Sequence, residues 1–261
     1  MIAGTNSGCG KTTVTCAVLQ ALVNRKINVS SFKCGPDYID PMFHKTVIGT
    51  AAYNLDTYLM SNDAVNYLLN KNSGDIAVVE GVMGFYDGFS FTEKGSTHEL
   101  SEITDTDVIL VVKCRGMSLS AMALVKGFKE FRKNNIKGVI FNNLSEKLYG
   151  DLSEECRKIG LVPLGFLPNI KDVQISSRHL GLVTAGEIDG IKDKMNLLAD
   201  YAEKYIDIDK ILEISENDRD TKFTSPEITK KYNVKIAVAY DRAFCFYYED
   251  NLNLLSEMGA E

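Results

Sequence analysis

The feature that constrains this chain most is a glycine-rich stretch at its start, where residues 2–13 read IAGTNSGCGKTT. A short apolar run enters the loop, and an amphipathic segment follows it. Backbone N–H groups in such a loop point inward and cradle phosphates, and the following helix N-terminus adds a partial positive charge. Lys11 is placed to bridge the β- and γ-phosphates, and the Thr12 hydroxyl to bind Mg²⁺. The pattern predicts a nucleoside triphosphate site.

The spacing departs slightly from the usual pattern, because Thr5 occupies the place of the first glycine and Gly4 lies one place earlier. The alternative is a glycine-rich turn that precedes Lys-Thr by chance. We favour ATP binding, because glycines, lysine and threonine fall in register between a strand and a helix. The residues expected to bind the nucleotide are Thr5, Asn6, Ser7, Gly8, Cys9, Gly10, Lys11, Thr12 and Thr13, together with Asn142 at the end of a later strand.

Composition narrows the class of protein. The 261 residues include 45% hydrophobic residues, and 29 basic against 35 acidic residues give a formal charge of −6. This charge argues against nonspecific nucleic-acid binding. No apolar run exceeds about five residues, far below a membrane span. We expect no signal peptide, and six cysteines without metal-ligand spacing indicate reduced thiols in the cytoplasm.

Buried strands alternating with helices predict an α/β fold with a doubly wound, mostly parallel sheet and helices on both faces. The loops that carry the candidate site residues all follow strands, so they should meet at the carboxyl edge, where such sheets bind ligands. Residues 53–56 are interpreted as a polar turn, and the loop 33–44 as irregular. The expected strands after the first are 28–32, 76–79, 108–112, 139–141, 162–167 and 235–240, and the later expected helices are 187–205 and 249–258.

Glu80 is the leading metal-ligand candidate, because it ends a buried strand downstream of the phosphate loop. A helix cap or a solvated strand end is the alternative. The loop 33–44 carries apolar and aromatic side chains among polar ones, which indicates either the wall of a binding site or groups tucked onto the core. Arg178 and His179 could contact a phosphate or carboxylate, or form a surface turn.

Five segments together resemble the cobyrinic acid a,c-diamide synthase family, amidotransferases of the cobalamin pathway. They are residues 33–44, 54–56, 80–88, 177–183 and 243–248. The resemblance runs in order along essentially the whole chain. It implies a P-loop fold of the dethiobiotin synthetase type, which uses ATP and Mg²⁺ to amidate tetrapyrrole acetate groups. A closely similar enzyme acts on nickel-sirohydrochlorin, and hydrogenobyrinate is a further candidate substrate.

The resemblance also implies roles for individual residues. Lys11, Lys33, Glu80 and Asp87 are expected to be catalytic, with Lys33 facing the transferred phosphoryl group or the substrate carboxylate. The expected metal ligands are Thr12, Asp56 and Glu80. The residues expected to contact the corrinoid or related tetrapyrrole are Tyr38, Ile39, Asp40, Asp87, Arg178 and His179.

The domain organisation is expected to be a synthetase domain at 1–205, a charged linker at 206–232 and the first part of a glutaminase domain at 233–261. The glutaminase nucleophile of the family would lie beyond Glu261, so Cys245 is not taken for it. A homodimer is implied by the family alone.

Two positions depart from the family pattern. Lys113 stands where an acidic residue is common, and Leu119 where a basic one is common. Two rival classes remain at this point. One is a partitioning or site-selection ATPase switch, which would carry a lysine where Asn6 stands. The other is a dethiobiotin-like synthetase that joins CO₂.

Overall fold

The computed structural model describes residues 1–170, 185–216, 223–229, 233–241 and 243–261. Its centre is a sheet of seven parallel strands in the order β3-β2-β4-β1-β5-β6-β7. The strands are β1 (Ile2–Gly4), β2 (Val29–Cys34), β3 (Ala51–Leu55), β4 (Ile76–Glu80), β5 (Val108–Lys113), β6 (Ile136–Asn142) and β7 (Val162–Leu167). The predicted doubly wound parallel sheet is confirmed.

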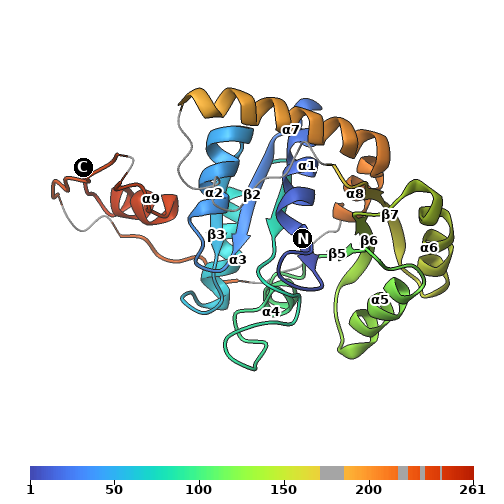
Figure 1. The fold of residues 1–261 in the computed structure, drawn as a ribbon. Coiled ribbons are helices and arrows are strands. Elements are labelled where there is room, and N and C mark those ends of the chain that lie inside the picture. Colours follow the sequence, from blue (N-terminus) through green and yellow to red (C-terminus); the bar gives the residue numbers. More distant parts are fainter. Residues whose placement is uncertain (171–184, 217–222, 230–232, 242) are drawn as a thin grey trace.

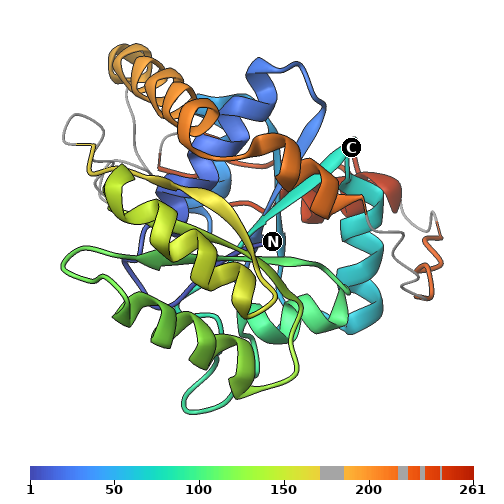
Figure 2. The same cartoon turned by 90° about the vertical axis from the view of Figure 1, so that its right-hand side faces the viewer.

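Helices cover both faces of this sheet, as Figures 1 and 2 show. They are α1 (Lys11–Asn24), α2 (Ile39–Phe43), the π-helix η1 (His44–Ile48), α3 (Asn62–Asn72), α4 (Thr97–Ile103), α5 (Ser120–Phe131), α6 (Glu146–Lys158), α7 (Ala185–Tyr205), α8 (Ile208–Ser215) and α9 (Glu249–Glu257). One face packs on α1, α7 and α8, and the other on α3, α4, α5 and α6.

Strand β5 shows why the chain forms two layers. Ile109 and Val111 lie in the core beneath α1 and α7, whereas Val108, Leu110 and Val112 lie in the core on the opposite face. Successive side chains of a strand point to opposite faces, so a continuous apolar run serves a sheet that is covered on both sides. Because the apolar runs are buried inside the sheet, the polar residues that follow them in the sequence lie at the strand ends.

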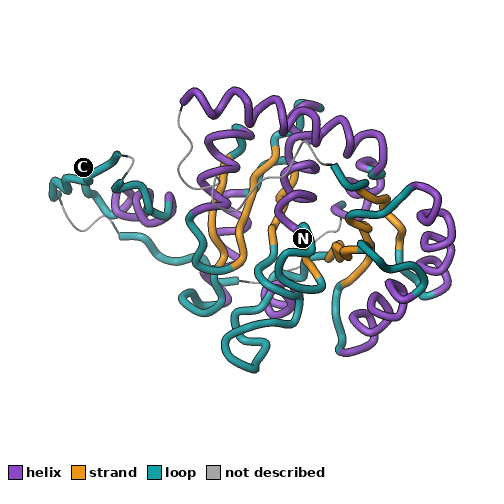
Figure 3. The backbone as a smooth tube through the Cα atoms, in the orientation of Figure 1, coloured by secondary structure: helices purple, strands orange, loops and turns teal. Residues whose placement is uncertain are grey.

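The parallel register places the chemistry at one edge. Lys33 pairs with Glu80 across β2 and β4, and the phosphate loop leaves the end of β1, which lies beside β4. In Figure 1 the arrowhead of β2 points toward this edge, and Figure 3 shows the loops gathered there in teal. The expectation that the candidate binding loops share the carboxyl edge is confirmed for the loops after β1, β2 and β4.

Two local expectations were wrong. Residues 53–56 do not form a separate turn, because 53–55 belong to the edge strand β3, in which only Asn54 and Leu55 are buried. Such a half-exposed edge strand lacks the apolar run that marked the central strands. The loop 33–44 is also more regular than expected, since it ends in α2, which continues directly into η1.

The C-terminal region differs from expectation in two places. The expected linker 206–232 begins with α8, whose Ile208 and Ile211 are buried against the main core. Within the described residues of the expected strand 235–240, no strand forms, although Val234 makes an isolated parallel bridge with Ala260. A lone strand has no partners here to complete a ladder. The expected helix at 249–258 is confirmed as α9.

Among the residues that the structure describes, no helix is long and apolar enough to cross a bilayer.

The cysteines make a testable pattern. Cys9, Cys16, Cys34, Cys114 and Cys156 are buried, whereas Cys245 is partly exposed. Burial raises the pKa of Cys34, Cys114 and Cys156 to about 12. Because the thiolate is the reactive form, we expect a thiol reagent at pH 8 to modify one cysteine rapidly in the native protein and six after unfolding in urea.

The control is Cys245→Ser, which should remove the rapid phase and leave five thiols in urea. Rapid modification of any cysteine in native Cys245→Ser would contradict the buried placement of the other five.

Candidate active site

The phosphate loop joins β1 to α1 and depends on glycine at two positions. Gly8 and Gly10 have φ values of 74° and 102°, in the left-handed region that favours glycine. A Cβ on Gly10 would also collide with the Asn142 side chain. The Asn142 amide Nδ2 donates to the Cys9 carbonyl over 2.9 Å. Asn142 therefore braces the loop from β6.

Lys11, the first residue of α1, is almost fully buried. Its Nζ donates to the carbonyl oxygens of Met83 and, over 3.3 Å, of Asn6. Burial lowers the pKa of Lys11 from its ordinary value. The ammonium group thus lies inside the loop, held by carbonyl groups of the loop itself and of the segment after β4.

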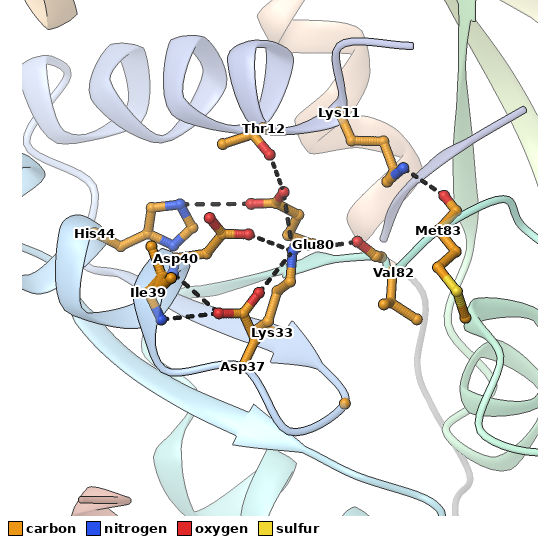
Figure 4. A network of polar contacts seen from close by, with 12 residues as sticks. Lys11, Thr12, Lys33, Asp37, Ile39, Asp40, His44, Glu80, Val82 and Met83 are labelled. Atoms are coloured by element: carbon orange, nitrogen blue, oxygen red, sulfur yellow. Dashed lines mark hydrogen bonds and ion pairs between the residues drawn. The ribbon is translucent and has the colours of Figure 1, made fainter. Parts of the chain in front are cut away.

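Glu80 and Thr12 meet directly beneath the start of α1, as Figure 4 shows. The Thr12 hydroxyl donates to Glu80 Oε1 over 2.6 Å. Glu80 is fully buried, and its second oxygen, Oε2, has no hydrogen-bond partner within the described structure. A buried carboxylate oxygen without a donor is costly, so this position suits a cation.

Lys33 provides a second buried cation next to Glu80. Its Nζ lies 3.2 Å from Glu80 Oε1, 3.9 Å from Asp37 Oδ2, and in hydrogen-bond contact with Asp40. Burial alone would lower the pKa of Lys33, but the carboxylates of Glu80 and Asp40 raise it above its ordinary value. Lys33 therefore stays protonated.

His44 is a site residue that the sequence analysis did not identify. Its Nδ1 lies 2.6 Å from Ser31 Oγ, and its Nε2 lies 3.6 Å from Glu80 Oε2. Burial lowers the pKa of His44 to about 4, so the ring is neutral at pH 7. Asp37, which was also not singled out, lies beside Lys33. One lysine and two aspartates at positions 33, 37 and 40 of a single loop form the sequence pattern that could have identified Asp37.

Lys11, Thr12, Lys33, Asp37 and Glu80 line an open pocket with a volume of about 550 Å³, whereas Asp40 and His44 are not part of its lining. The lining comes from the phosphate loop, the loop after β2 and the segment after β4. The predicted site residues that line it are Ser7, Gly8, Gly10, Lys11, Thr12, Thr13, Lys33 and Glu80. The structure therefore brings most of the expected phosphate-loop residues, two of the three expected metal ligands and Lys33 into one cavity.

Asp56 and Asp87 do not line this pocket. Asp56 is buried at the end of β3, where Oδ1 accepts from the backbone N–H groups of Tyr58 and Leu59. Its Oδ2 has no hydrogen-bond partner within the described residues. Asp87 is exposed, and its Oδ2 accepts from the Gly84 N–H over 2.9 Å. Both carboxylates thus cap turns at the rim of the same edge, and their metal or substrate roles remain predictions.

Tyr38 and Ile39 lie outside the pocket lining as well. The Tyr38 ring stacks on Tyr248, with ring centroids 4.6 Å apart, and Ile39 is 38% exposed. Arg178 and His179 fall outside the residues that the structure describes.

The two departures from the family pattern lie at the same edge. Lys113 ends β5, and its Nζ donates to the Gly8 carbonyl over 3.4 Å. Leu119 is 66% exposed at the start of α5. The end of β5 therefore presents the Lys113 ammonium group to the phosphate loop, at a position where the family pattern has an acidic residue.

The donor set fits Mg²⁺ better than a soft metal. Mg²⁺ is usually held by one or two carboxylates or hydroxyls plus the phosphates of a bound nucleotide. Thr12 Oγ1 and Glu80 Oε1 supply two such oxygens, and Glu80 Oε2, which accepts no hydrogen bond within the described structure, supplies a third. Among the described residues, no cluster of three or more His, Cys, Asp or Glu side chains forms a metal site. A metal bound by protein ligands alone is thus not indicated by this part of the chain.

Fold and site together define a P-loop nucleotide-binding domain. The chain belongs to the family described as CobQ/CobB/MinD/ParA nucleotide binding domain, whose sequence model matches residues 1–183.

Curated relatives narrow this class. A cobyrinate a,c-diamide synthase of Thermoplasma volcanium is 43% identical over 267 residues, which cover 100% of this chain and 58% of that protein. Another, of Clostridium acetobutylicum, is 41% identical over 263 residues, which cover 99% of this chain and 60% of that protein. The resemblance to this synthase family is confirmed. The chain spans about three fifths of the length of these relatives.

Among solved structures, the MinD cell division protein of Aquifex aeolicus is 16% identical, with a TM-score of 0.48 over 76% of this chain and 95% of that one.

Proposed function

We propose that the chain is the ATP-dependent half of an amidotransferase that converts the a- and c-acetate carboxylates of cobyrinic acid to amides. The observation that carries the proposal is the meeting of Thr12, Glu80 and Lys33 at one carboxylate oxygen, Glu80 Oε1. Thr12 and Glu80 thus offer a hydroxyl and a carboxylate that could bind Mg²⁺, and the Lys33 ammonium group beside them could stabilise a transferring phosphoryl group. The names of the curated relatives support cobyrinate as the acid.

The chemistry requires activation of the carboxylate, because oxide is a poor leaving group. A carboxylate oxygen of the substrate attacks the γ-phosphorus of ATP, the bond to the β–γ bridging oxygen breaks, and ADP leaves. Ammonia then attacks the acyl carbon, the bond to phosphate breaks, and the amide forms with loss of a proton. Neither step needs a general base to activate the acid, so positioning and charge neutralisation dominate.

The residues of this chain divide these tasks. The loop N–H groups and Lys11 bind the β- and γ-phosphates, while Lys33 faces the transferred phosphoryl group or the substrate carboxylate. Asp37 and Asp40 orient Lys33 through the contacts described above. Thr12 and Glu80 would hold Mg²⁺, which neutralises phosphate charge when bound. The bound substrates must displace water from this open pocket, because water would hydrolyse the acyl phosphate.

The proposed domain organisation follows the relatives' greater length. The synthetase domain, predicted at 1–205, is extended to Ser215, because α8 packs on the main core. The rest of the predicted linker, up to residue 232, connects it to residues 233–261, which are the first part of a glutaminase domain that supplies ammonia from glutamine. The proposed partners are this glutaminase domain and a tetrapyrrole acid.

We expect the 261-residue chain to form mono- and diamides from cobyrinic acid, ATP, Mg²⁺ and ammonium, detected by mass spectrometry as a loss of about 1 Da per amidation. Glutamine in place of ammonium should give no product, since the proposed glutaminase nucleophile is absent from these residues. Hydrogenobyrinic acid and nickel-sirohydrochlorin, tested in parallel, identify the preferred ring.

The outcomes are distinguishable. No ADP release with any of the three acids would refute the proposed synthetase activity. Amide formation from glutamine would refute the proposed division of labour between the two halves.

A further inference from the structure

The C-terminal segment 243–257 docks against the part of the chain that follows β2. Tyr248, which precedes α9, stacks on Tyr38 with a ring-centroid distance of 4.6 Å and an interplanar angle of 14°. Phe246 also packs on the Tyr38 ring, in a tilted arrangement with a centroid distance of 5.4 Å. Tyr38 therefore makes its aromatic contacts with a segment about 200 residues later in the sequence.

Ionic and polar contacts hold α9 in this position independently of the stack. Glu249 pairs with Lys45 over 2.6 Å at the start of the helix, and Glu257 pairs with Lys71 over 2.6 Å at its end. Asp250 accepts from the side-chain amide of Asn72 over 2.8 Å. The helix thus has anchors on η1 and α3 that do not involve Tyr38. Figure 1 shows α9 beside β3 and α3 on this side of the molecule.

In the sequence, Tyr38 lies between Asp37 and Asp40, which are two of the three carboxylate residues that contact Lys33. Asp37 Oδ1 accepts from the backbone N–H groups of Ile39, over 2.8 Å, and of Asp40, over 3.4 Å. The Asn54 amide donates to the carbonyl of Asp37 over 2.6 Å. This backbone is fixed on one side by Asn54 of β3, and its outer side is covered by the Tyr38–Tyr248 stack.

The ring that Tyr248 contributes to the stack is neutral. Burial and the neighbouring Tyr38 raise the pKa of Tyr248 above its ordinary value, and the Asp56 and Asp37 carboxylates add to this effect. Tyr248 therefore remains a phenol throughout the physiological pH range. Stacked aromatic pairs stabilise a contact beyond the area that they bury.

We infer that Tyr248 is a positioning residue for the pocket: by stacking on Tyr38, it holds the backbone turn that presents Asp37 and Asp40 to Lys33. A residue of the proposed C-terminal domain thereby sets the geometry of the site that activates the acid. The effect on turnover rests on the proposed function, whereas the effect on the turn does not.

The direct test is hydrogen exchange of the peptide covering residues 35–43 in the 261-residue chain. In Tyr248→Ala, we expect this peptide to exchange about tenfold faster than in the wild type, because the stack on Tyr38 is lost. Tyr248→Phe keeps the ring and should stay within about twofold of the wild type. Glu257→Gln, which weakens the far end of α9 without touching the stack, is the matched control and should leave residues 35–43 unchanged.

Turnover provides the second readout. With ammonium as the nitrogen source, Tyr248→Ala should raise the KM for cobyrinic acid about tenfold and leave the KM for ATP within about twofold, because the phosphate loop is untouched. Tyr248→Phe should restore the wild-type KM.

Three results would overturn the inference: wild-type exchange at 35–43 in Tyr248→Ala, equal acceleration in Glu257→Gln, or a Phe variant as disturbed as the Ala variant. If the wild-type chain makes no amide from any tetrapyrrole acid, the proposed function fails, while the exchange data still decide the role of Tyr248.

Discussion

Replacing Lys11 by alanine should lower ATP turnover on the order of 10³-fold. The ammonium group is buried within the loop, where it contacts the carbonyl groups of Met83 and Asn6 rather than a carboxylate. Among the described residues, the other lysines near the loop have different partners, because Lys33 contacts Asp40 and Glu80 and Lys113 contacts the Gly8 carbonyl. Loss of the Lys11 ammonium group therefore removes a charge proposed to act on the transferring phosphate. ADP release measured with cobyrinic acid and ammonium checks the expectation.

The matched control is Lys126→Ala, an exposed lysine of α5 that pairs with Glu130. It should retain wild-type turnover and the wild-type unfolding midpoint. Lys11→Ala should also fold, because its side chain borders the pocket and not the apolar core. Wild-type turnover in Lys11→Ala would place the triphosphate elsewhere.

Glu80→Gln should reduce turnover roughly 10²-fold and raise the Mg²⁺ concentration needed for half-maximal activity. The amide retains the size of the side chain and one oxygen for the Thr12 hydroxyl, but it removes the charge that favours a divalent cation. Lys33 keeps its contact with Asp40, so the buried ammonium is not left alone. Activity titrated with MgCl₂ at fixed ATP measures the change.

Glu130→Gln provides the control, since this exposed glutamate of α5 contacts only Lys126 among the ion pairs of the described chain. It should leave both the maximal rate and the Mg²⁺ dependence unchanged. An identical Mg²⁺ titration for Glu80→Gln and the wild type would remove Glu80 from the metal site.

The sequence predicted the parts of the site that depend on local pattern. Lys11 and Thr12 follow from the loop motif, and Glu80 from its place after an apolar strand. Lys33 and Asp40 were assigned through the family resemblance, and the structure places both next to Glu80. The residues lie close together because parallel strands bring their carboxyl ends to the same edge of the sheet. The roles assigned to them stay predictions.

Other features depend on contacts between distant segments and were missed. His44 reaches Glu80 only because α2 and η1 turn the chain back beneath α1. Strand β3 is short and its residues 51–53 are not fully buried, because it forms the edge of the sheet. The helix α8 was overlooked within a charged region, although Ile208 and Ile211 already showed helical spacing. Asp87 was assigned through the family resemblance; its carboxylate caps the turn at Gly84, and its catalytic and substrate-binding roles stay predictions.

The pairing of Lys33 with Glu80 ties the chemistry of this chain to its hydrophobic interior. A shift of β2 by one residue against β4 would turn the lysine toward α3 and bring an apolar side chain, Phe32 or Cys34, to face Thr12. Such a shift would also move the β2 side chains of each core to the opposite face of the sheet, and many buried contacts would be lost. Substitutions that merely repack β2 are therefore expected to impair the reaction, even when no charged residue is altered.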